Sequence, residues 1–374
     1  MSRRPLDYLL NNPVRVKRFT FSGIVKDVPL FFSVIALLIF GFFMLYSASG
    51  QSETMLLRQM FFSCMGLFLM IVIAQFNLIS YRLVLIHFYW IGLALLIYVL
   101  LNPSEQSNAS RWIDLGIISF QPSELVRLIL PLAVASFLTR KQIKPLIRDW
   151  FIVMLAIFIC SFLIFKEPDL GTAIIVFFSG CIPVFLSGFP FSIILLFLFL
   201  VVSLSPFLWN SLEPYMQSRL LTLLDSESDP LGAGWNIAQS KVAIGSGGLF
   251  GKGYLSGTQS QLDFIPASHT DFIFSVIAEE LGLFGILFLL ILYIFILVRI
   301  FKISFNAETS FDRLVSISIG FILLTFIIVN ISMVVGVIPV VGVPLPLISQ
   351  GGTAIAIHLI SFGIVLSVKK MQVW

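Results

Sequence analysis

Asp271 is the residue of this 374-residue chain whose type and position most directly suggest chemistry. It opens an apolar run that ends at Ile300 and follows a polar stretch that contains His269. An ionisable group at a lipid boundary is costly, so such residues are usually functional or tightly paired. A carboxylate in this place could act as a general base, orient a substrate or bind a cation.

Small residues follow Asp271 at helical spacing. If a helix starts near Asp271, then Ser275, Ala278, Gly282 and Gly285 lie within about 40° of it around the axis. That face could line a cavity, or its small residues could allow close helix packing. Both interpretations stay open, although packing does not account for Asp271.

Two further acids, Glu279 and Glu280, lie inside the same apolar run. Adjacent residues on a helix point to different sides, so each acid needs its own partner. We expect a structural or gating role for both. An acid pair within the membrane is also the feature that would favour transport.

A glycine-rich segment at residues 245–253 precedes this run. It is not a P-loop, because position 246 is Ser and position 253 is Gly, where that motif requires Gly and then Ser or Thr. The glycines are expected to allow tight turns and close backbone approach. Lys241 and Lys252 could hold a phosphate group or could simply be solvated.

Other polar residues fall in segments that connect apolar runs on the same side. Asp169 at the start of a run is expected to cap a helix, and it could pair with Arg111 or Lys166. Glu124 and Arg219 are further candidates for this side. His269 is the histidine placed for chemistry, whereas His87, His358 and the three cysteines lie inside apolar runs and are expected to be core residues.

The composition places the chain in a membrane. Hydrophobic residues make up 58% of it, charged residues 11%, and the mean hydropathy is +1.03. Ten apolar runs predict an all-α integral membrane protein with about ten transmembrane helices. The runs are Pro29–Ser47, Leu57–Phe76, Leu83–Leu101, Glu124–Thr139, Trp150–Phe165, Thr172–Gly188, Phe189–Trp209, Asp271–Ile300, Leu314–Val335 and Thr353–Val368.

The distribution of Lys and Arg predicts the orientation. Residues 1–28 are rich in Arg and Lys, which predicts a cytoplasmic N-terminal segment, and ten crossings return residues 369–374 to that side. Residues 210–270, between the seventh and eighth runs, then form the large extracytoplasmic loop of a single polytopic domain. The net charge of +4 is a topology signal, and we expect no nucleic-acid binding.

Several segments together resemble the SEDS family (shape, elongation, division and sporulation). They are SASGQ at 47–51, RWIDLG at 111–116, QPSEL at 121–125, PDLGTA at 168–173, DPLGAG at 229–234, QSKVAIGSGGLFGKG at 239–253, HTDFIF at 269–274, AEELG at 278–282 and PVVGVPLPLIS at 339–349. Within the family, the resemblance is to the rod-shape elongation branch rather than the division branch.

The resemblance implies a glycosyltransferase of the bacterial inner membrane that polymerises lipid II into peptidoglycan at the outer face during cell elongation. Asp271 matches the family's essential aspartate, as general base or as a carboxylate that orients the substrate or a divalent ion such as Mg²⁺ or Mn²⁺. No ligand cluster demands such an ion. Arg111, Lys241 and Lys252, with Lys166 and Arg219 behind them, are candidates to face the pyrophosphate, and Asp169, His269 and Glu124 complete the expected substrate site.

The same resemblance implies structural or gating roles for Pro344 and Pro346. It implies as partners a class B penicillin-binding protein, the elongation proteins MreC, MreD and RodZ, and membrane lipids. Two other functions stay open. One is a flippase that moves lipid II outward, favoured by Glu279 and Glu280; the other is a non-catalytic scaffold for the transpeptidase.

Overall fold

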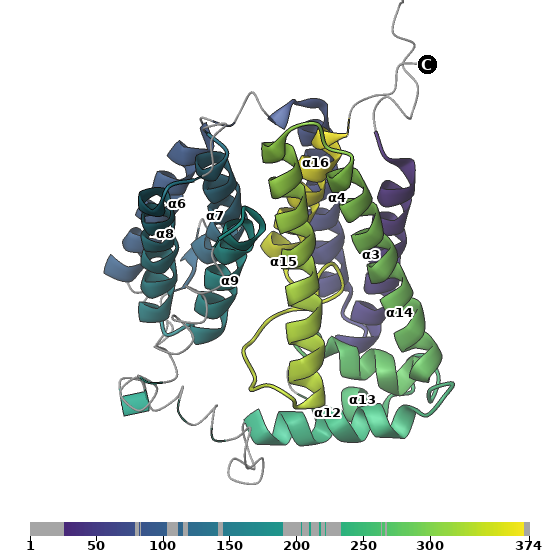
Figure 1. The fold of residues 1–374 in the computed structure, drawn as a ribbon. Helices are drawn as coiled ribbons and strands as arrows, with labels where there is room; N and C mark the ends of the chain where they lie inside the picture. The colour runs from purple at the N-terminus through teal and green to yellow at the C-terminus, as the bar shows by residue number, and fades with distance from the viewer. Residues whose placement is uncertain are drawn as a thin grey trace, which may run out of the picture.

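The computed structural model describes residues 26–78, 82, 84–102, 111–114, 119–140, 145–189, 203, 209–210, 217, 221, 233–262, 264–265 and 268–369. The predicted seventh run lies almost wholly outside the described residues. Arg219 also lies outside them. Each of the other nine apolar runs corresponds to a helix, which confirms the all-α prediction (Figure 1).

The helices that correspond to apolar runs are α3 (Val28–Ala48), α4 (Glu53–Gln75), α6 (Val84–Leu101), α7 (Pro122–Leu138), α8 (Ile147–Lys166), α9 (Leu170–Leu186), α14 (Ile273–Phe305), α15 (Ser310–Val335) and α16 (Gly352–Val368). Six of them, α3, α4, α6, α8, α14 and α15, are long and apolar enough to span a bilayer. The chain is therefore a multi-pass membrane protein.

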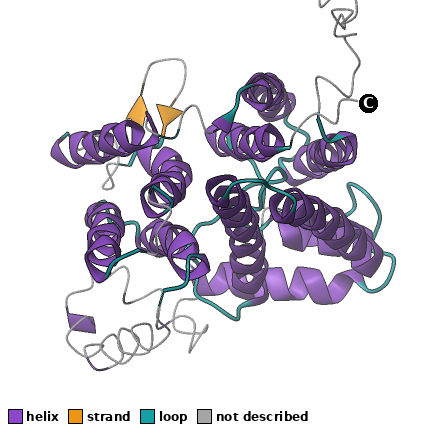
Figure 2. Cartoon of the chain, turned by 45° about the horizontal axis from the view of Figure 1, so that its top comes forward, coloured by secondary structure: helices purple, strands orange, loops and turns teal. Residues whose placement is uncertain are grey.

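The segment predicted as one long loop contains two helices, α12 (Ala233–Gly247) and α13 (Thr258–Gln261). Helix α12 lies across the end of the bundle, below α15 in the view of Figure 1. The glycine-rich segment is thus partly helical, because its first residues complete α12. Two two-residue strands, β1 (Ile113–Asp114) and β2 (Ser119–Phe120), pair antiparallel and stand beside the helices in Figure 2.

The helices form two groups (Figure 1), and each group has its own set of core residues, although three residues of α7 belong to the core of the other group. Residues such as Leu130, Ile157 and Val176 pack together among α6, α7, α8 and α9. A larger core unites α3, α4, α14, α15 and α16. A small cluster that includes Ile175 of α9 and Phe326 of α15 joins the groups. The segment after α15 reaches this junction.

A buried carboxylate, Asp27, connects three helices at one end of the bundle, where the first and last described residues lie. Asp27 caps α3 by accepting a hydrogen bond from the Leu30 amide at 3.0 Å. The same carboxylate pairs with Arg299 of α14 at 2.6 Å and with Lys369 after α16 at 2.8 Å. Three helices that are distant in sequence are thereby tied at one point, which we call the terminal end. The opposite end carries Asp271, α12 and α13.

Candidate functional site

Asp271 lies in a turn just before α14, which begins at Ile273. Its side chain is half-buried. The Asn330 side-chain amide of α15 donates to the Asp271 carbonyl at 2.8 Å and to the Val343 carbonyl at 2.7 Å. One buried amide therefore holds the Asp271 backbone against the segment that follows α15, and the position of the carboxylate is set by two other elements.

That segment, residues 336–351, runs without helix through the bundle and is largely buried from Val343 to Ser349. Such backbone is tolerated inside a membrane protein when its polar groups find partners in the protein. The Tyr293 hydroxyl donates to the Pro346 carbonyl at 2.6 Å, and Gln59 donates to the Ser349 carbonyl at 2.9 Å. The Ser349 hydroxyl donates to the Thr270 carbonyl at 2.5 Å, which adds a second tie beside Asp271.

The first part of the segment, from Gly336 to Gly342, brings three predicted site regions together. At Gly336 a Cβ atom would lie 2.8 Å from the Lys241 ammonium, and at Gly342 it would lie 3.7 Å from Asp271 Oδ2. Between them, the Val341 carbonyl would lie 2.4 Å from a Cβ atom on Gly171, two residues after Asp169. Six residues extend at most about 20 Å, so Lys241, the Asp169 loop and Asp271 surround one short strip of backbone.

Arg111 joins this strip through the loop between α8 and α9. Its guanidinium donates to the carbonyls of Glu167, at 3.1 Å, and Pro168, and lies 3.7 Å from the Asp169 carboxylate. Asp169 also caps α9 by accepting from the Thr172 amide at 3.1 Å. Both expectations for Asp169, capping and pairing with Arg111, are confirmed.

Glu167 is the second acid of this loop, and its side chain is buried without a hydrogen-bond partner at either carboxyl oxygen. Burial, together with the negative charge of Asp169, raises the pKa of Glu167 to about 8, although Arg111 acts in the opposite direction. At neutral pH the Glu167 side chain is then mainly the uncharged acid, so Asp169 is the charged partner of the Arg111 guanidinium in this loop.

Helix α14 is interrupted at Gly282, whose φ of 63° and ψ of −157° are not helical. The predicted stripe from Asp271 to Gly285 on one helix is therefore wrong, because the axis begins after Asp271 and breaks within the stripe. In a regular helix the carbonyls of Glu279 and Glu280 would accept from residues 283 and 284. Here they accept from the amides of Lys252 and Gly253, at 2.9 and 3.0 Å.

The freed amides of α14 are satisfied by the same glycine-rich segment. Leu283 donates to the Gly248 carbonyl at 3.0 Å, and Phe284 donates to the Leu249 carbonyl at 3.2 Å. A Cβ atom on Gly251 would lie 2.1 Å from the Glu280 carbonyl oxygen, so this backbone approach requires glycine. The prediction of close backbone approach is confirmed, and the break in α14 is its cause.

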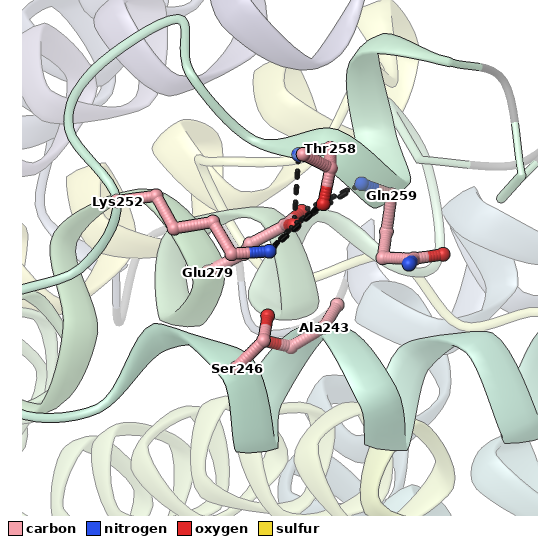
Figure 3. Close-up of polar contacts among 6 residues, drawn as sticks. All are labelled: Ala243, Ser246, Lys252, Thr258, Gln259 and Glu279. Carbon is pink, nitrogen blue, oxygen red and sulfur yellow. Dashed lines mark hydrogen bonds and ion pairs between the residues drawn. The ribbon is translucent and has the colours of Figure 1, made fainter.

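Lys252 is an exposed residue, but its ammonium group has partners within the protein. Its ammonium donates to Glu279 Oε1 at 2.7 Å and to the Thr258 hydroxyl at 2.8 Å (Figure 3). Glu279 is fully buried and also accepts from the amides of Thr258 and Gln259, at 2.8 and 3.1 Å. The ion pair therefore fastens α13 and the glycine-rich segment to α14, as Figure 3 shows.

The remaining predicted residues occupy separate places. Glu280 accepts from the Ser47 hydroxyl of α3 at 2.5 Å, so the two adjacent acids do have different partners. Glu124 is buried in the first turn of α7. Lys166 is exposed, with its ammonium 5.6 Å from the Phe162 ring centroid. Burial lowers the pKa of the half-buried His269, which favours a neutral imidazole at pH 7.

Pro344 and Pro346 lie in the non-helical segment, Pro346 fully buried and Pro344 partly so. Asn330, by contrast, is a site residue that the sequence reasoning missed. Its signal was present, because an amide inside the apolar run from Leu314 to Val335 is itself a costly polar group. Lys241 differs from Lys252 in that it has no hydrogen bond or ion pair to the described residues and is exposed.

Within the part of the chain that the structure describes, no group of three or more His, Cys, Asp or Glu side chains could hold a metal ion. The residues around Asp271 supply a carboxylate whose backbone is held in place, an exposed ammonium group on α12 and a guanidinium bound to the α8–α9 loop. A carboxylate near two cations suits the transfer of a group from an anionic donor to a hydroxyl acceptor.

The fold and site define a polytopic α-helical membrane protein with a carboxylate site at one end of its bundle. The family model for the FtsW, RodA and SpoVE type, described as "Cell cycle protein", matches residues 28–373. The chain belongs to this family, which is the one its motifs resemble.

Similar proteins cover nearly the whole chain. The peptidoglycan glycosyltransferase MrdB of Escherichia coli K12 is 46% identical over 353 residues, which are 94% of this chain and 95% of that protein. Stage V sporulation protein E of Bacillus subtilis is 33% identical, with 92% and 97% covered.

Solved structures share the fold. A chain from a peptidoglycan synthase complex that coordinates polymerization and crosslinking superposes with a TM-score of 0.80 and is 34% identical, covering 92% of this chain and 97% of that one. The rod shape determining protein RodA of Thermus thermophilus gives 0.69 and is 30% identical, covering 92% and 96%.

Proposed function

We propose that the chain is a peptidoglycan glycosyltransferase that polymerises lipid II into glycan strands during cell elongation. The observation that carries the proposal is the convergence of Asp271, Lys241 and the Asp169 loop on residues 336–342. The similar proteins named as peptidoglycan glycosyltransferases support the reaction class, since they match almost end to end.

In this reaction the hydroxyl of the acceptor sugar attacks the anomeric carbon of the donor, and undecaprenyl pyrophosphate leaves. Asp271 orients the hydroxyl or accepts its proton as the new glycosidic bond forms. Because the Asp271 backbone is fixed by Asn330 and its neighbour Thr270 by Ser349, the carboxylate needs little reorganisation before the reaction.

Negative charge that develops on the pyrophosphate requires a cation. Lys241 is suited to this role, since it is exposed next to Gly336 and has no ion-pair partner among the described residues. Arg111 is fixed to the Asp169 loop and can contribute charge from the α9 side. Lys252 is assigned instead to the support of α14, because Glu279 neutralises it.

The proposed orientation puts the terminal end in the cytoplasm and Asp271 at the outer face of the inner membrane. It rests on the excess of Lys and Arg near the terminal end, including Lys26, Arg299 and Lys369. We infer a class B penicillin-binding protein as partner, supported by the likeness to a synthase complex that couples polymerization with crosslinking. MreC, MreD and RodZ are proposed as further members of the assembly.

The flippase alternative rested on Glu279 and Glu280 as parts of a transport path. Glu279 binds Lys252 and α13, and Glu280 binds Ser47, which supports a structural role for both acids. The proposed polymerase site lies instead at the end of the bundle, where the Asp271 carboxylate can contact the sugar of a substrate from the aqueous side.

Asp271→Asn in the full-length protein, assayed with its transpeptidase partner on lipid II, tests the proposal. We expect glycan synthesis to fall at least 100-fold, within the range that general bases contribute. Glu53→Gln is the matched control, since Glu53 is an exposed acid in the first turn of α4 at the same end of the bundle. Full polymerisation by the Asn variant would overturn the assignment.

Co-purification of the partner with Asp271→Asn distinguishes catalysis from scaffolding. A complex that stays intact while glycan synthesis is lost excludes a role as scaffold alone. A liposome assay that follows labelled lipid II across the bilayer tests the flippase alternative. Translocation that is abolished by Asp271→Asn, with polymerisation unchanged, would favour the flippase.

A further inference from the structure

An apolar groove lies between α6, α7 and α8, far from the Asp271 site. It has a volume of about 280 Å³ and is lined by side chains that include Tyr89, Trp90, Ala133, Phe137 and Ala156. Trp90 is 60% exposed, so the groove is open to the lipid side of the bundle. Tyr89 keeps its hydroxyl satisfied by donating to the Ala156 carbonyl at 3.2 Å, which leaves the groove surface apolar.

A second cavity, of about 340 Å³, lies at the end of α7 and the start of α8. Its charged lining residues are Arg140, Arg148 and Asp149. Asp149 is committed to capping, since its carboxylate accepts from the Leu146 amide at 3.0 Å. The side chains of Arg140 and Arg148 are exposed and have no hydrogen bond or ion pair to the described residues. Among the described residues, the cavity therefore presents two arginine side chains and one carboxylate, and neither arginine forms an ion pair with it.

The two cavities are neighbours, because Phe137 and Ile152 line both. A third cation lies near the charged part, where Arg82 donates to the Ser136 carbonyl at 3.3 Å and to the Thr139 hydroxyl at 3.0 Å. The charged cavity is at the terminal end of the bundle, since Arg82 also lies over the ring of Phe311, at the start of α15, 5.3 Å from its centroid. A ligand that fits both parts has an apolar chain and an anionic head.

We propose that these two neighbouring cavities, which together we call the α7–α8 groove, bind an anionic glycerophospholipid. The acyl chain occupies the apolar part, and the phosphate lies between Arg140 and Arg148. Basic pockets between transmembrane helices at the cytoplasmic side are suited to such head groups. Under the proposed orientation the site faces the cytoplasmic leaflet, opposite the end at which the isoprenyl pyrophosphate is released, so a phospholipid fits better than an isoprenyl phosphate.

The test uses the purified full-length chain in detergent, titrated with phosphatidylglycerol or with phosphatidylethanolamine of the same acyl chains, and read by native mass spectrometry. Each basic residue near an anionic head group contributes about a fivefold change in affinity, so Arg140→Gln with Arg148→Gln should weaken phosphatidylglycerol binding by roughly 25-fold. Lys302→Gln with Arg313→Gln is the matched control, since it removes two exposed cations at the same end outside the groove.

Ala156→Phe tests the apolar part without a change of charge, and Leu287→Phe on the exposed face of α14 is its control. We expect only the former to weaken phosphatidylglycerol binding. Gel filtration and melting temperature confirm that each variant is folded. Equal affinity for the two lipids, or no loss in the arginine variant, would overturn the proposal. So would competition by inorganic phosphate alone, or stronger arginine-dependent binding of an isoprenyl phosphate.

Discussion

The exchange of hydrogen bonds between the glycine-rich segment and α14 makes a quantitative prediction for Gly251→Ala. The new Cβ atom would lie 2.1 Å from the Glu280 carbonyl oxygen and 2.3 Å from the carbonyl carbon, and both are backbone atoms that cannot rotate away. Gly251 also has a φ of 76°, a left-handed conformation that costs an alanine about 1 kcal/mol. The segment must therefore withdraw from α14.

Withdrawal breaks the four hydrogen bonds between the segment and residues 279–284. If α14 then closes into a regular helix, two bonds return, so the net loss is two bonds at about 1 kcal/mol each. With the cost of φ, the total is about 3 kcal/mol. Lys252 would also move away from Glu279, which adds to the cost.

Gly248→Ala is the matched control. Gly248 has a φ of 57°, and no atom lies within 4 Å of the position its Cβ would take. It should lose only about 1 kcal/mol from its backbone conformation. Melting of the detergent-purified variants should thus place Gly251→Ala clearly below Gly248→Ala, with the wild type highest. Equal melting temperatures for the two variants would refute the argument that backbone contact with Glu280 requires glycine.

Three further outcomes follow from the charged groups. Lys252→Gln should destabilise the protein by about 2 kcal/mol, because it leaves buried Glu279 without its cation. Lys241→Gln should leave the melting temperature unchanged and slow lipid II polymerisation. The reverse pattern would show that the two lysines have exchanged roles. The raised pKa of Glu167 predicts that folding favours its neutral form, so wild-type stability should fall relative to Glu167→Gln as pH rises from about 4.5 through about 8. Parallel melting curves for the two proteins across that range would contradict a raised pKa. At the terminal end, burial raises the pKa of Asp27, but hydrogen bonds from Arg299, Lys369 and Leu30 outweigh burial and lower the pKa overall. The contribution of Asp27 to the free energy of unfolding is therefore fully present above its unfolded pKa of 3.8 and is lost as pH falls below that value. Asp27→Asn should remove about 2 kcal/mol at pH 7 and progressively less as pH falls below 3.8, as measured by thermal melting.

Much of the bundle could be predicted from the sequence. Long apolar runs must form helices in a bilayer, because their backbone groups have no other partner there, and nine of the predicted runs have helices at closely matching bounds. The helix caps at Asp169 and the close backbone approach of the glycine-rich segment were also predictable. These features depend on local residue types and on the lipid environment.

The break in α14 could not be predicted, because its cause lies in a segment about thirty residues earlier in the chain. The run from Asp271 to Ile300 reads as one helix, and Gly282 alone does not show that four bonds to another segment replace two of its own. Nor could the roles of the two lysines be separated, since both look like free cations until Glu279 is placed beside one of them.

By itself, the sequence determined that this is an all-α membrane protein of the SEDS family and that Asp271 is its outstanding carboxylate. The length of an apolar run and the residues of a short motif are local properties of the chain, so both can be identified in the sequence. The tertiary structure alone decided what surrounds that carboxylate. Asn330, Val343 and Gly342 lie about sixty to seventy residues beyond Asp271, and only helix packing brings their short-range hydrogen bonds and contacts to it.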